Sequence, residues 1–339
     1  MRTLEVKRDE VSETRICEGD DPAIGEGQAL LRIERFGLTA NNATYALIGD
    51  LLAYWSHFPG AEDGWGRVPA WGIAEVVESR SDELEVGTRL FGFVPMSTHL
   101  VIEPRSLAGG GIEDASAHRQ ELPAFYRMFN PAPEGHVNQT VILQPLFFTA
   151  LVLDTAMAKH GAEQVVLSSA SSRTATATAF FVAQRDVKLV GLTSERNAEW
   201  VRELGIYDSV LTYDEVDQIE QRRSVYIEFA GNGEVRDAVH ERLGDELKHS
   251  AGVGITHQNP GGFAASEDLP GPAPEIFFAP DHKPDRDPLA AWGEYCTWVE
   301  GWLGFDERAG IDEAGEAWGC VLGGELGPGT ATVIVLRDD

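Results

Sequence analysis

The segment 165–205 constrains the fold of this chain more than any other part of the sequence. It begins with a short apolar run at 165–167, which is typical of a parallel strand buried on both of its faces. Small residues at 168–172 predict a tight turn, and a helix is expected over 174–184. A strand that leads through a tight turn into a helix is typical of the start of a nucleotide-binding α/β sheet.

The same alternation continues in the second half of this segment. Residues 187–192 are again apolar and predict a second strand. Thr193 or Ser194 can cap the helix that follows, and Gly205 stands where a helix end favours a residue that tolerates positive φ. The sequence therefore predicts the α/β class, with a doubly wound parallel sheet in this part of the chain.

The turn at 168–172 lacks the glycines that are usual in a dinucleotide-binding turn. Such a turn uses glycine where the backbone bends, where the pyrophosphate approaches and where the helix packs on the strand. A G-x-x-G-x-x-G pattern laid over this segment falls on Ser169, Ser172 and Ala175. Because all three residues are small, the close approach of a phosphate stays possible.

Phosphate binding at this turn would depend on hydroxyls, on one arginine and on the helix N-terminus. The N–H groups and the dipole of a helix start favour an anion, and an arginine adds a charge-assisted contact. The sequence therefore predicts a pyrophosphate site at Ser169, Ser171, Ser172, Arg173 and Thr174. The alternative is a structural turn in a sheet that has lost its ligand.

The end of the second strand indicates which dinucleotide fits. NAD-specific folds usually place Asp or Glu there to hold the ribose 2′-hydroxyl. Here Thr193 and Ser194 supply two hydroxyls and Arg196 follows, a set that suits a 2′-phosphate better. Glu195 favours NAD instead, and Arg196 also fits the solvated start of a helix. The prediction is NADP(H), held at this end by Thr193, Ser194 and Arg196.

The composition excludes several classes of function. A formal net charge of −28 with no basic tract makes nucleic acid and anionic membrane surfaces poor partners. No apolar run approaches the roughly 18 residues that cross a bilayer, and the charged start of the sequence lacks the apolar middle of a signal peptide. The 3 cysteines are scattered, as is typical of reduced thiols. We therefore expect a cytoplasmic protein, and 339 residues suffice for two domains.

The N-terminal part of the sequence has a different pattern. Short strand-like segments, among them 29–33 and 70–77, alternate with turns that contain glycine and proline. Between these two strands, LTANNATYALIGD predicts a loop and a short helix. Such spacing predicts a small β-barrel-like domain.

The order of these segments resembles the medium-chain dehydrogenase/reductase superfamily. GQALLRIERFGL, AWGIAEVVES, LEVGTRLFGF and STHLVIEP are similar to its catalytic domain, and VVLSSASSRTA, VGLTSERN and VRELG follow in the order of its cofactor domain. The segments LTANN, SSAS and FFAP are similar to those of a bacterial domain-of-unknown-function branch. The resemblance implies a GroES-like β-rich catalytic domain at 1–145, which 300–339 rejoins, and a Rossmann-type cofactor-binding domain at 146–299.

The zinc ligands of the superfamily's alcohol dehydrogenases have no counterpart in this sequence. Those enzymes carry a cysteine near the position of Leu38 and a Gly-His-Glu segment near Trp71. Three distant cysteines also cannot form a four-cysteine structural site. The resemblance is therefore to the zinc-independent quinone and enoyl reductases, and we expect no metal.

The resemblance also implies which segment would bind the substrate. Candidates to polarise a substrate oxygen are Asn41, Asn42, Tyr45 and Tyr54. Each of them also fits a satisfied structural contact in a loop. His57 and His99 are candidate acids, with a structural role as the alternative. The zinc-independent reductases often carry an acid in the segment that matches 39–42, and this chain has none there.

Further candidates for the cofactor lie beyond the second helix. Ala230 and Gly231 stand at a predicted strand C-terminus, where ligands bind in open α/β sheets. Tyr213 is a further candidate, and the resemblance places the loop that begins at Gly254 beside the nicotinamide.

The segment 103–141 is longer than the superfamily usually needs. It fits a lid or an oligomer contact, but a surface insertion is the expectation. Aromatic residues at 54–58 and 125–129 allow an apolar or aromatic ligand, although such residues line many cores too.

The sequence predicts a zinc-independent, NADP(H)-dependent oxidoreductase that transfers hydride to an activated C=C bond (an enone or enoyl compound) or to a quinone-like acceptor. Its substrate would be a small apolar or aromatic molecule, and the resemblance implies a homodimer. Two alternatives stay open. One is a non-catalytic nucleotide- or ligand-binding protein on a reductase scaffold, favoured by the missing turn glycines and the missing acid near Asn42. The other is a redox-neutral lyase or isomerase that retains bound NADP.

Overall fold

The chain divides into two compact units. The structure is a computed structural model and describes residues 1–51, 53–108, 110–120, 122–253, 269–325 and 327–336. The first unit comprises Met1–Ile142 and Leu303–Asp339, and the second comprises Leu143–Trp302. Each unit has a hydrophobic core of its own.

The first unit is built from antiparallel strands with one parallel pair at an edge. Its larger sheet has the order β17-β18-β3-β5-β6-β10-β9-β8, and β7 also pairs with β3. The bounds of these strands are β3 (Ala29–Leu38), β5 (Pro69–Ser79), β6 (Arg89–Pro95), β7 (His99–Ile102), β8 (Pro104–Ser106), β9 (Ile112–Asp114), β10 (Met128–Pro131), β17 (Gly304–Ala309) and β18 (Thr330–Val335). A smaller sheet joins β2 (Thr14–Glu18), β1 (Arg2–Lys7) and β4 (Trp65–Gly66). The predicted β-rich domain is therefore present, with strands longer than expected.

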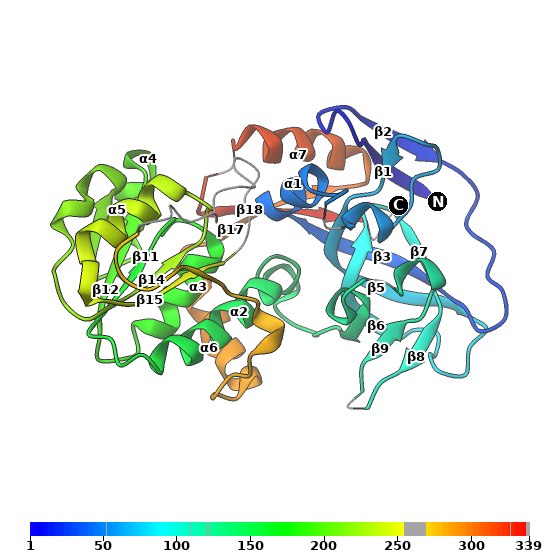
Figure 1. The fold of residues 1–339 in the computed structure, drawn as a ribbon. Helices are drawn as coiled ribbons and strands as arrows, with labels where there is room; N and C mark the ends of the chain where they lie inside the picture. The colour runs from blue at the N-terminus through cyan, green and yellow to red at the C-terminus, as the bar shows by residue number, and fades with distance from the viewer. Residues whose placement is uncertain (52, 109, 121, 254–268, 326, 337–339) are drawn as a thin grey trace. The chain divides into compact units, whose positions relative to one another are not determined.

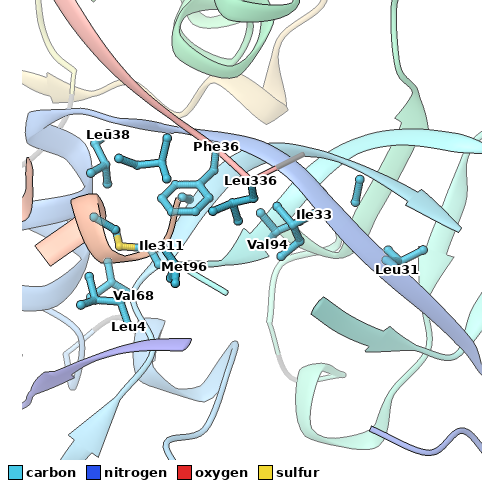
Figure 2. Close-up of a cluster of buried hydrophobic side chains, with 14 of the residues drawn as sticks. Leu4, Leu31, Ile33, Phe36, Leu38, Val68, Val94, Met96, Ile311 and Leu336 are labelled. Carbon is cyan, nitrogen blue, oxygen red and sulfur yellow. The ribbon is translucent and has the colours of Figure 1, made fainter. Parts of the chain in front are cut away.

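The core of the first unit lies between these sheets and the C-terminal helix α7 (Asp312–Gly323). Figure 2 shows apolar side chains from distant parts of the chain meeting in it, and labels Leu4, Leu31, Ile33, Phe36, Leu38, Val68, Val94, Met96, Ile311 and Leu336. Trp318 of α7 is fully buried, and its indole N–H donates to the Val11 carbonyl at 2.7 Å. The C-terminal segment thus completes a core that the N-terminal segment begins.

The second unit is organised around a parallel sheet with the order β13-β12-β11-β14-β15-β16. Figure 1 labels four of these strands, β11, β12, β14 and β15. Its strands are β11 (Gln164–Leu167), β12 (Lys188–Thr193), β13 (Ser209–Thr212), β14 (Ser224–Glu228), β15 (Leu247–Gly252) and β16 (Glu275–Ile276). Every described pair in this sheet is parallel. Counted along the chain, the order is 3-2-1-4-5-6, the doubly wound arrangement that the sequence predicts.

Helices cover both faces of this sheet because its strands alternate their side chains between two cores. Val165 and Leu167 of β11 pack with residues of α2 (Val137–Ala158) and α3 (Arg173–Val182). Val166 points to the other face and packs with α5 (Gly233–Leu243). The remaining helices are α4 (Glu195–Glu203) and α6 (Pro288–Val299). A strand buried on both faces needs apolar residues at every position, which is why the run at 165–167 is continuous.

Helix α2 corrects the expectation that no apolar segment approaches the length that crosses a bilayer. The helix begins at Val137, and over its 22 residues it is long and apolar enough to cross a membrane by length and composition alone. However, 61% of its most apolar window is buried inside the protein. It also carries the buried Asp154, which accepts hydrogen bonds from the Arg185 guanidinium at 2.5 and 2.7 Å. We interpret α2 as a core helix, for which a high apolar content is normal.

The segment 103–141 is not the surface insertion that the sequence suggests. Its strand β10 pairs antiparallel with β6 and with β9, so it extends the larger sheet of the first unit. Arg119 and Asp114 from this segment are fully buried, and Phe129 packs in the core. The prediction failed because each strand here has only three or four residues, too few to show an alternating pattern.

Candidate functional site

The turn that joins β11 to α3, residues 168–172, is called the serine turn here. Ser169 lies in the left-handed region with φ of 47°, where a glycine would normally be expected. Ser172 is the N-cap of α3, and its Oγ accepts from the Ala175 N–H at 3.2 Å. Ala175 is fully buried, so the helix packs closely on the strand despite the missing glycine. A serine therefore adopts the backbone conformation that the motif usually assigns to glycine.

The hydroxyls of the serine turn keep hydrogen-bonding capacity for a ligand. Asn197 Nδ2 donates to Ser171 Oγ at 3.0 Å, and Ser172 Oγ also acts as an acceptor. A hydroxyl that accepts still has its own proton to donate. Ser169 Oγ and the Tyr213 hydroxyl lie 3.3 Å apart, and either can be the donor. Together with the first N–H groups of α3, the turn is suited to bind an anion.

A buried carboxylate braces the serine turn against the turn that follows β14. Glu228 is 4% exposed and accepts a hydrogen bond from the Ser168 hydroxyl at 3.0 Å. The same carboxylate accepts from the N–H groups of Ala230 and Gly231, and Gly231 has a positive φ of 68°. Strands β11 and β14 are neighbours at the point where the strand order reverses, which is where open α/β sheets bind ligands. The predicted residues Ala230 and Gly231 therefore lie next to the serine turn.

The three residues predicted for a 2′-phosphate differ in their environments. Thr193 ends β12 and is 1% exposed, and its hydroxyl has no hydrogen-bond partner among the described residues. Ser194 is the N-cap of α4, and Arg196 is exposed in the first turn of that helix. A buried hydroxyl without a partner costs roughly 1–3 kcal/mol, which a ligand oxygen would recover. This end of the sheet thus offers one orphaned hydroxyl and one solvated guanidinium.

Three further predicted residues of the second unit have different outcomes. Arg173 is the first residue of α3, and burial lowers its pKa to about 10, so its guanidinium stays charged at neutral pH. Thr174, beside it, is partly buried in the first turn of the same helix. Gly254 lies outside the residues that the structure describes.

In the first unit, Asn42 has a clear structural task. It sits in α1 (Ala40–Leu47), where its Oδ1 accepts from the Thr39 N–H at 2.7 Å and completes a capping box. Its Nδ2 donates to the Pro69 carbonyl at 2.9 Å, and the residue is 2% exposed. Asn41, by contrast, is exposed. The side-chain amide of Asn42, which was predicted to polarise a substrate, therefore already has protein partners on both its oxygen and its nitrogen.

The two predicted tyrosines lie in an aromatic group that we call the tyrosine cluster. Its members are Tyr45, Tyr54, His57, Trp71, Phe93, Phe125 and Tyr126. The rings of Tyr45 and Tyr54 are 4.5 Å apart, and the hydroxyls of Tyr54 and Tyr126 are 3.1 Å apart. Phe93 of β6 is fully buried beneath them, whereas Phe125 is 37% exposed. The cluster therefore has a buried base and a partly exposed rim.

Burial keeps the ionisable groups of the cluster neutral. Desolvation lowers the pKa of His57 to about 3, and the nearby charges of Arg119 and His118 act in the same direction. Desolvation raises the pKa of Tyr45, Tyr54 and Tyr126 above the ordinary tyrosine value. Near pH 7 the tyrosines are therefore hydrogen-bond donors, and His57 is an uncharged imidazole.

A polar pocket of about 390 Å³ also opens in the first unit. Its lining includes Arg8, Asp50, Trp55, Glu62 and Trp65, but none of the predicted site residues. Arg8 forms an ion pair with Asp50 there. Among the described residues, no group of three or more His, Cys, Asp or Glu side chains could hold a metal ion.

Residues 36–325 match the model of a family described as "Protein of unknown function (DUF2855)". The chain belongs to this family. No curated protein matches the sequence. The matched residues span both units and include the serine turn as well as the tyrosine cluster.

Several solved structures share the fold of this DUF2855 protein. CurA from Vibrio vulnificus in complex with NADPH is 14% identical with a TM-score of 0.62, and the match covers 100% of each chain. The quinone oxidoreductase from Coxiella burnetii is 13% identical with a TM-score of 0.65, covering 99% of each chain. The yhdH oxidoreductase from Salmonella enterica in complex with NADP is 13% identical with a TM-score of 0.60, covering 99% of this chain and 100% of that one. These matches confirm the resemblance to the medium-chain dehydrogenase/reductase superfamily at the level of the fold, with a GroES-like and a Rossmann-type domain.

The structure of the DUF2855 protein brings the predicted residues into two groups. One connected set of turns in the second unit holds six of them: Ser169, Ser171, Ser172, Tyr213, Ala230 and Gly231. In the first unit, Tyr45 and Tyr54 share a cluster, whereas Asn41 lies on the surface.

Sequence analysis did not single out Glu228 or the pairing of Tyr126 with Tyr54. A lone acid at the end of the apolar strand SVYIE was a usable signal for Glu228. Tyr126 lies in the aromatic stretch 125–129, but its pairing with Tyr54 joins positions 72 residues apart and leaves no local pattern.

Proposed function

We propose that this protein is an NADPH-dependent, zinc-independent oxidoreductase that reduces an activated C=C bond or a quinone-like acceptor. In this proposal the second unit binds the cofactor and the first unit binds a small apolar or aromatic substrate. The observation that carries the proposal is the serine turn at the switch point of a 3-2-1-4-5-6 parallel sheet. Structural neighbours with the same fold were solved with NADPH or NADP bound, which supports the choice of cofactor.

The residues of the second unit fit a dinucleotide phosphate. Ser169 supplies the backbone bend, and the hydroxyls of Ser171 and Ser172 retain protons to donate. The orphaned hydroxyl of Thr193 gives a buried partner at the end of β12, and Arg196 gives a positive charge at the start of α4. We assign the pyrophosphate to the serine turn with Arg173 and Thr174, and the 2′-phosphate to Thr193, Ser194 and Arg196.

The side chains of this protein would position and shield the reactants rather than react themselves. When bound, NADPH supplies the hydride, which no side chain can provide. The tyrosine cluster would exclude water from the substrate, and the Tyr45 and Tyr54 hydroxyls would donate to the substrate oxygen on which negative charge develops. Asn41 and Asn42 stay weaker candidates for that donor role, because the first is exposed and the second is held in a capping box.

The proposal is tested by titrating the purified protein with NADPH and with NADH. Binding of each nucleotide is measured by tryptophan quenching and by thermal shift. We expect NADPH to bind more tightly, and Arg196→Ala to weaken NADPH about tenfold while leaving NADH unchanged. Arg202→Ala, on the exposed last turn of the same helix, is the matched control and should change neither affinity. Equal loss in both variants would remove Arg196 from the 2′-phosphate site.

Turnover is tested next by following NADPH consumption with 2-cyclohexen-1-one and with 1,4-benzoquinone. Activity that survives a chelator such as EDTA is expected for a zinc-independent enzyme. If neither nucleotide binds, both the cofactor and the reductase activity are excluded.

A second candidate function is a non-catalytic binding protein on the same scaffold. It is favoured by Asn42, whose oxygen and nitrogen are both engaged by Thr39 and Pro69 rather than left to a substrate. This candidate predicts nucleotide binding without steady NADPH consumption. Consumption with any enone or quinone would exclude it.

We also propose that the protein forms homodimers. The edge strand β16 exposes Ile276 at 71%, and Phe278, just beyond it, is 50% exposed. An edge strand with exposed apolar side chains at and just beyond its end is a surface for pairing with a second chain. Ile276→Lys should therefore shift the mass measured by light scattering toward the monomer, whereas Leu289→Lys, at an exposed helix start, should not.

A further inference from the structure

The Tyr54–Tyr126 pair has an unused hydrogen-bond donor. Two hydroxyls joined by one hydrogen bond at 3.1 Å use a single proton between them. The second hydroxyl proton has no acceptor among the described residues. A polar group in an apolar setting gains from finding a partner, so this proton is available to an oxygen atom that enters the cluster.

A second, independent observation points to a ligand in the same cluster. His57 is 1% exposed, and its Nδ1 atom has no hydrogen-bond partner among the described side chains and backbone groups. Its ring centre lies 5.4 Å from that of Tyr126 and 5.8 Å from that of Tyr54. Such an orphaned polar atom beside an unused donor is costly in a folded protein unless a bound molecule satisfies it.

The rim of the cluster consists of aromatic rings. Trp71, Phe125 and Tyr126 are all partly exposed, with ring centres 5.4 Å apart for Trp71 and Phe125, and 5.5 Å apart for Phe125 and Tyr126. Aromatic side chains of this kind bind planar apolar groups by stacking and edge contacts. The combination of aromatic walls with a neutral donor suits a carbonyl-bearing aromatic molecule better than a charged one.

The position of Tyr126 depends on a buried arginine. Arg119 is fully buried, and its Nη1 donates to Asp114 Oδ2 at 2.9 Å while its Nη2 donates to the Tyr126 carbonyl at 2.5 Å. Its guanidinium also lies 4.9 Å from the centre of the Phe58 ring, next to His57. One planar group therefore ties the backbone of Tyr126 to the segment that carries Tyr54 and His57.

We infer that Tyr126 is a substrate-recognition residue of this protein, which together with Tyr54 binds the carbonyl oxygen of a flat aromatic ligand. Arg119 is the residue that positions Tyr126. The inference rests on the proposed function for the role of the ligand as a substrate. Binding itself is independent of any cofactor.

The test compares two flat molecules that differ by one oxygen, 9-fluorenone and fluorene. Their affinities are measured by tryptophan quenching with no nucleotide present. We expect Tyr126→Phe to weaken 9-fluorenone about five- to tenfold and to leave fluorene unchanged, because only the ketone uses the hydroxyl. Tyr295→Phe, which removes a buried hydroxyl without a partner in the second unit, is the matched control and should change neither affinity.

The positioning role of Arg119 is tested by coupling. Arg119→Lys keeps the charge beside Asp114 but cannot hold two acceptors with one planar group. We expect it to weaken 9-fluorenone several-fold in the wild-type background and to have no further effect in a Tyr126→Phe background. A merely structural role would instead weaken fluorene as well, and to the same extent in both backgrounds.

Two results would overturn the inference: no binding of 9-fluorenone to the wild-type protein, or equal losses for the ketone and the hydrocarbon in Tyr126→Phe. These results are distinguishable from failure of the proposed function, which shows as a lack of NADPH binding or turnover.

Discussion

The serine turn of the second unit and the tyrosine cluster of the first unit are built in opposite ways. The serine turn comes from consecutive residues, 168–172, whose conformation follows from one strand and one helix. The tyrosine cluster collects residues from α1, from β5 and β6, and from the segment around Tyr126. The first proposed site is local in sequence and the second is not.

This difference has energetic consequences. The serine turn depends on small terms, a strained φ at Ser169 and single hydroxyl contacts, so individual changes should have modest effects on stability. The tyrosine cluster depends on a buried ion pair and on neutral buried groups, so individual changes should have large effects.

Loss of the buried Arg119 guanidinium should have the largest effect. Arg119→Met leaves the carboxylate of Asp114 buried without its cation, since both side chains are at most 1% exposed. We expect the free energy of unfolding to fall by about 3–5 kcal/mol in a urea titration. Arg105→Gln removes an arginine that is 57% exposed and pairs with Glu113 in the same segment, and should cost under about 1 kcal/mol. Equal losses would mean that the buried pair does not anchor the cluster.

The histidine of the cluster should make the protein sensitive to acid. Because the pKa of His57 is about 3 in the folded protein and ordinary in the unfolded chain, the unfolded chain binds more protons between these values. Its contribution to stability is therefore complete above about pH 6.5 and declines as the pH falls toward 3. Between pH 7.5 and pH 5 the wild type should lose about 2 kcal/mol more than His57→Phe, measured by urea unfolding at each pH. Parallel losses in the two proteins would show that His57 is not the group responsible.

The two asparagines of α1 should behave differently from each other. Asn42→Ala removes the capping box and the bond to the Pro69 carbonyl, and should lower the free energy of unfolding by about 1–2 kcal/mol. Asn41→Ala changes an exposed residue and should stay within about 0.5 kcal/mol of the wild type. If the Asn42 variant keeps its fold at assay temperature but loses NADPH turnover, the catalytic assignment of Asn42 is supported over the structural one.

The serine turn should give the smallest effect, with a sign that depends on the replacement. Ser169→Gly removes the steric cost of a positive φ and should raise the free energy of unfolding by up to about 1 kcal/mol, less the lost contact with Tyr213. Ser169→Ala keeps the steric cost and loses the contact, so it should lower stability by about 0.5–1 kcal/mol. Thermal denaturation of the two variants side by side shows whether the signs differ. Destabilisation by glycine would mean that the hydroxyl contact outweighs the backbone strain.

Much of the second unit could be predicted from the sequence because its signals are local. The apolar run before Ser168 and the positive φ of Gly205 are found where they were expected, and α3 begins at Arg173, one residue before the expected start at Thr174. The start of α2 could not be predicted, because the residue before it, His136, is not a usual N-cap residue and because Pro145 stands inside the helix. For the same reason the apolar length of that helix was underestimated.

The two candidate sites also differ in whether their sequence signals are local. The sequence by itself determined the parallel α/β sheet and the serine turn, since buried parallel strands need continuous apolar residues and a tight turn needs small ones. Only the tertiary structure decided that Glu228 braces the serine turn, that Asn42 serves a helix cap, and that Tyr126 meets Tyr54. Each of these depends on which acceptor or ring lies within a few ångströms of a polar group. Backbone patterning does not encode that proximity, because strands of three or four residues and contacts across 72 positions leave no periodic signal.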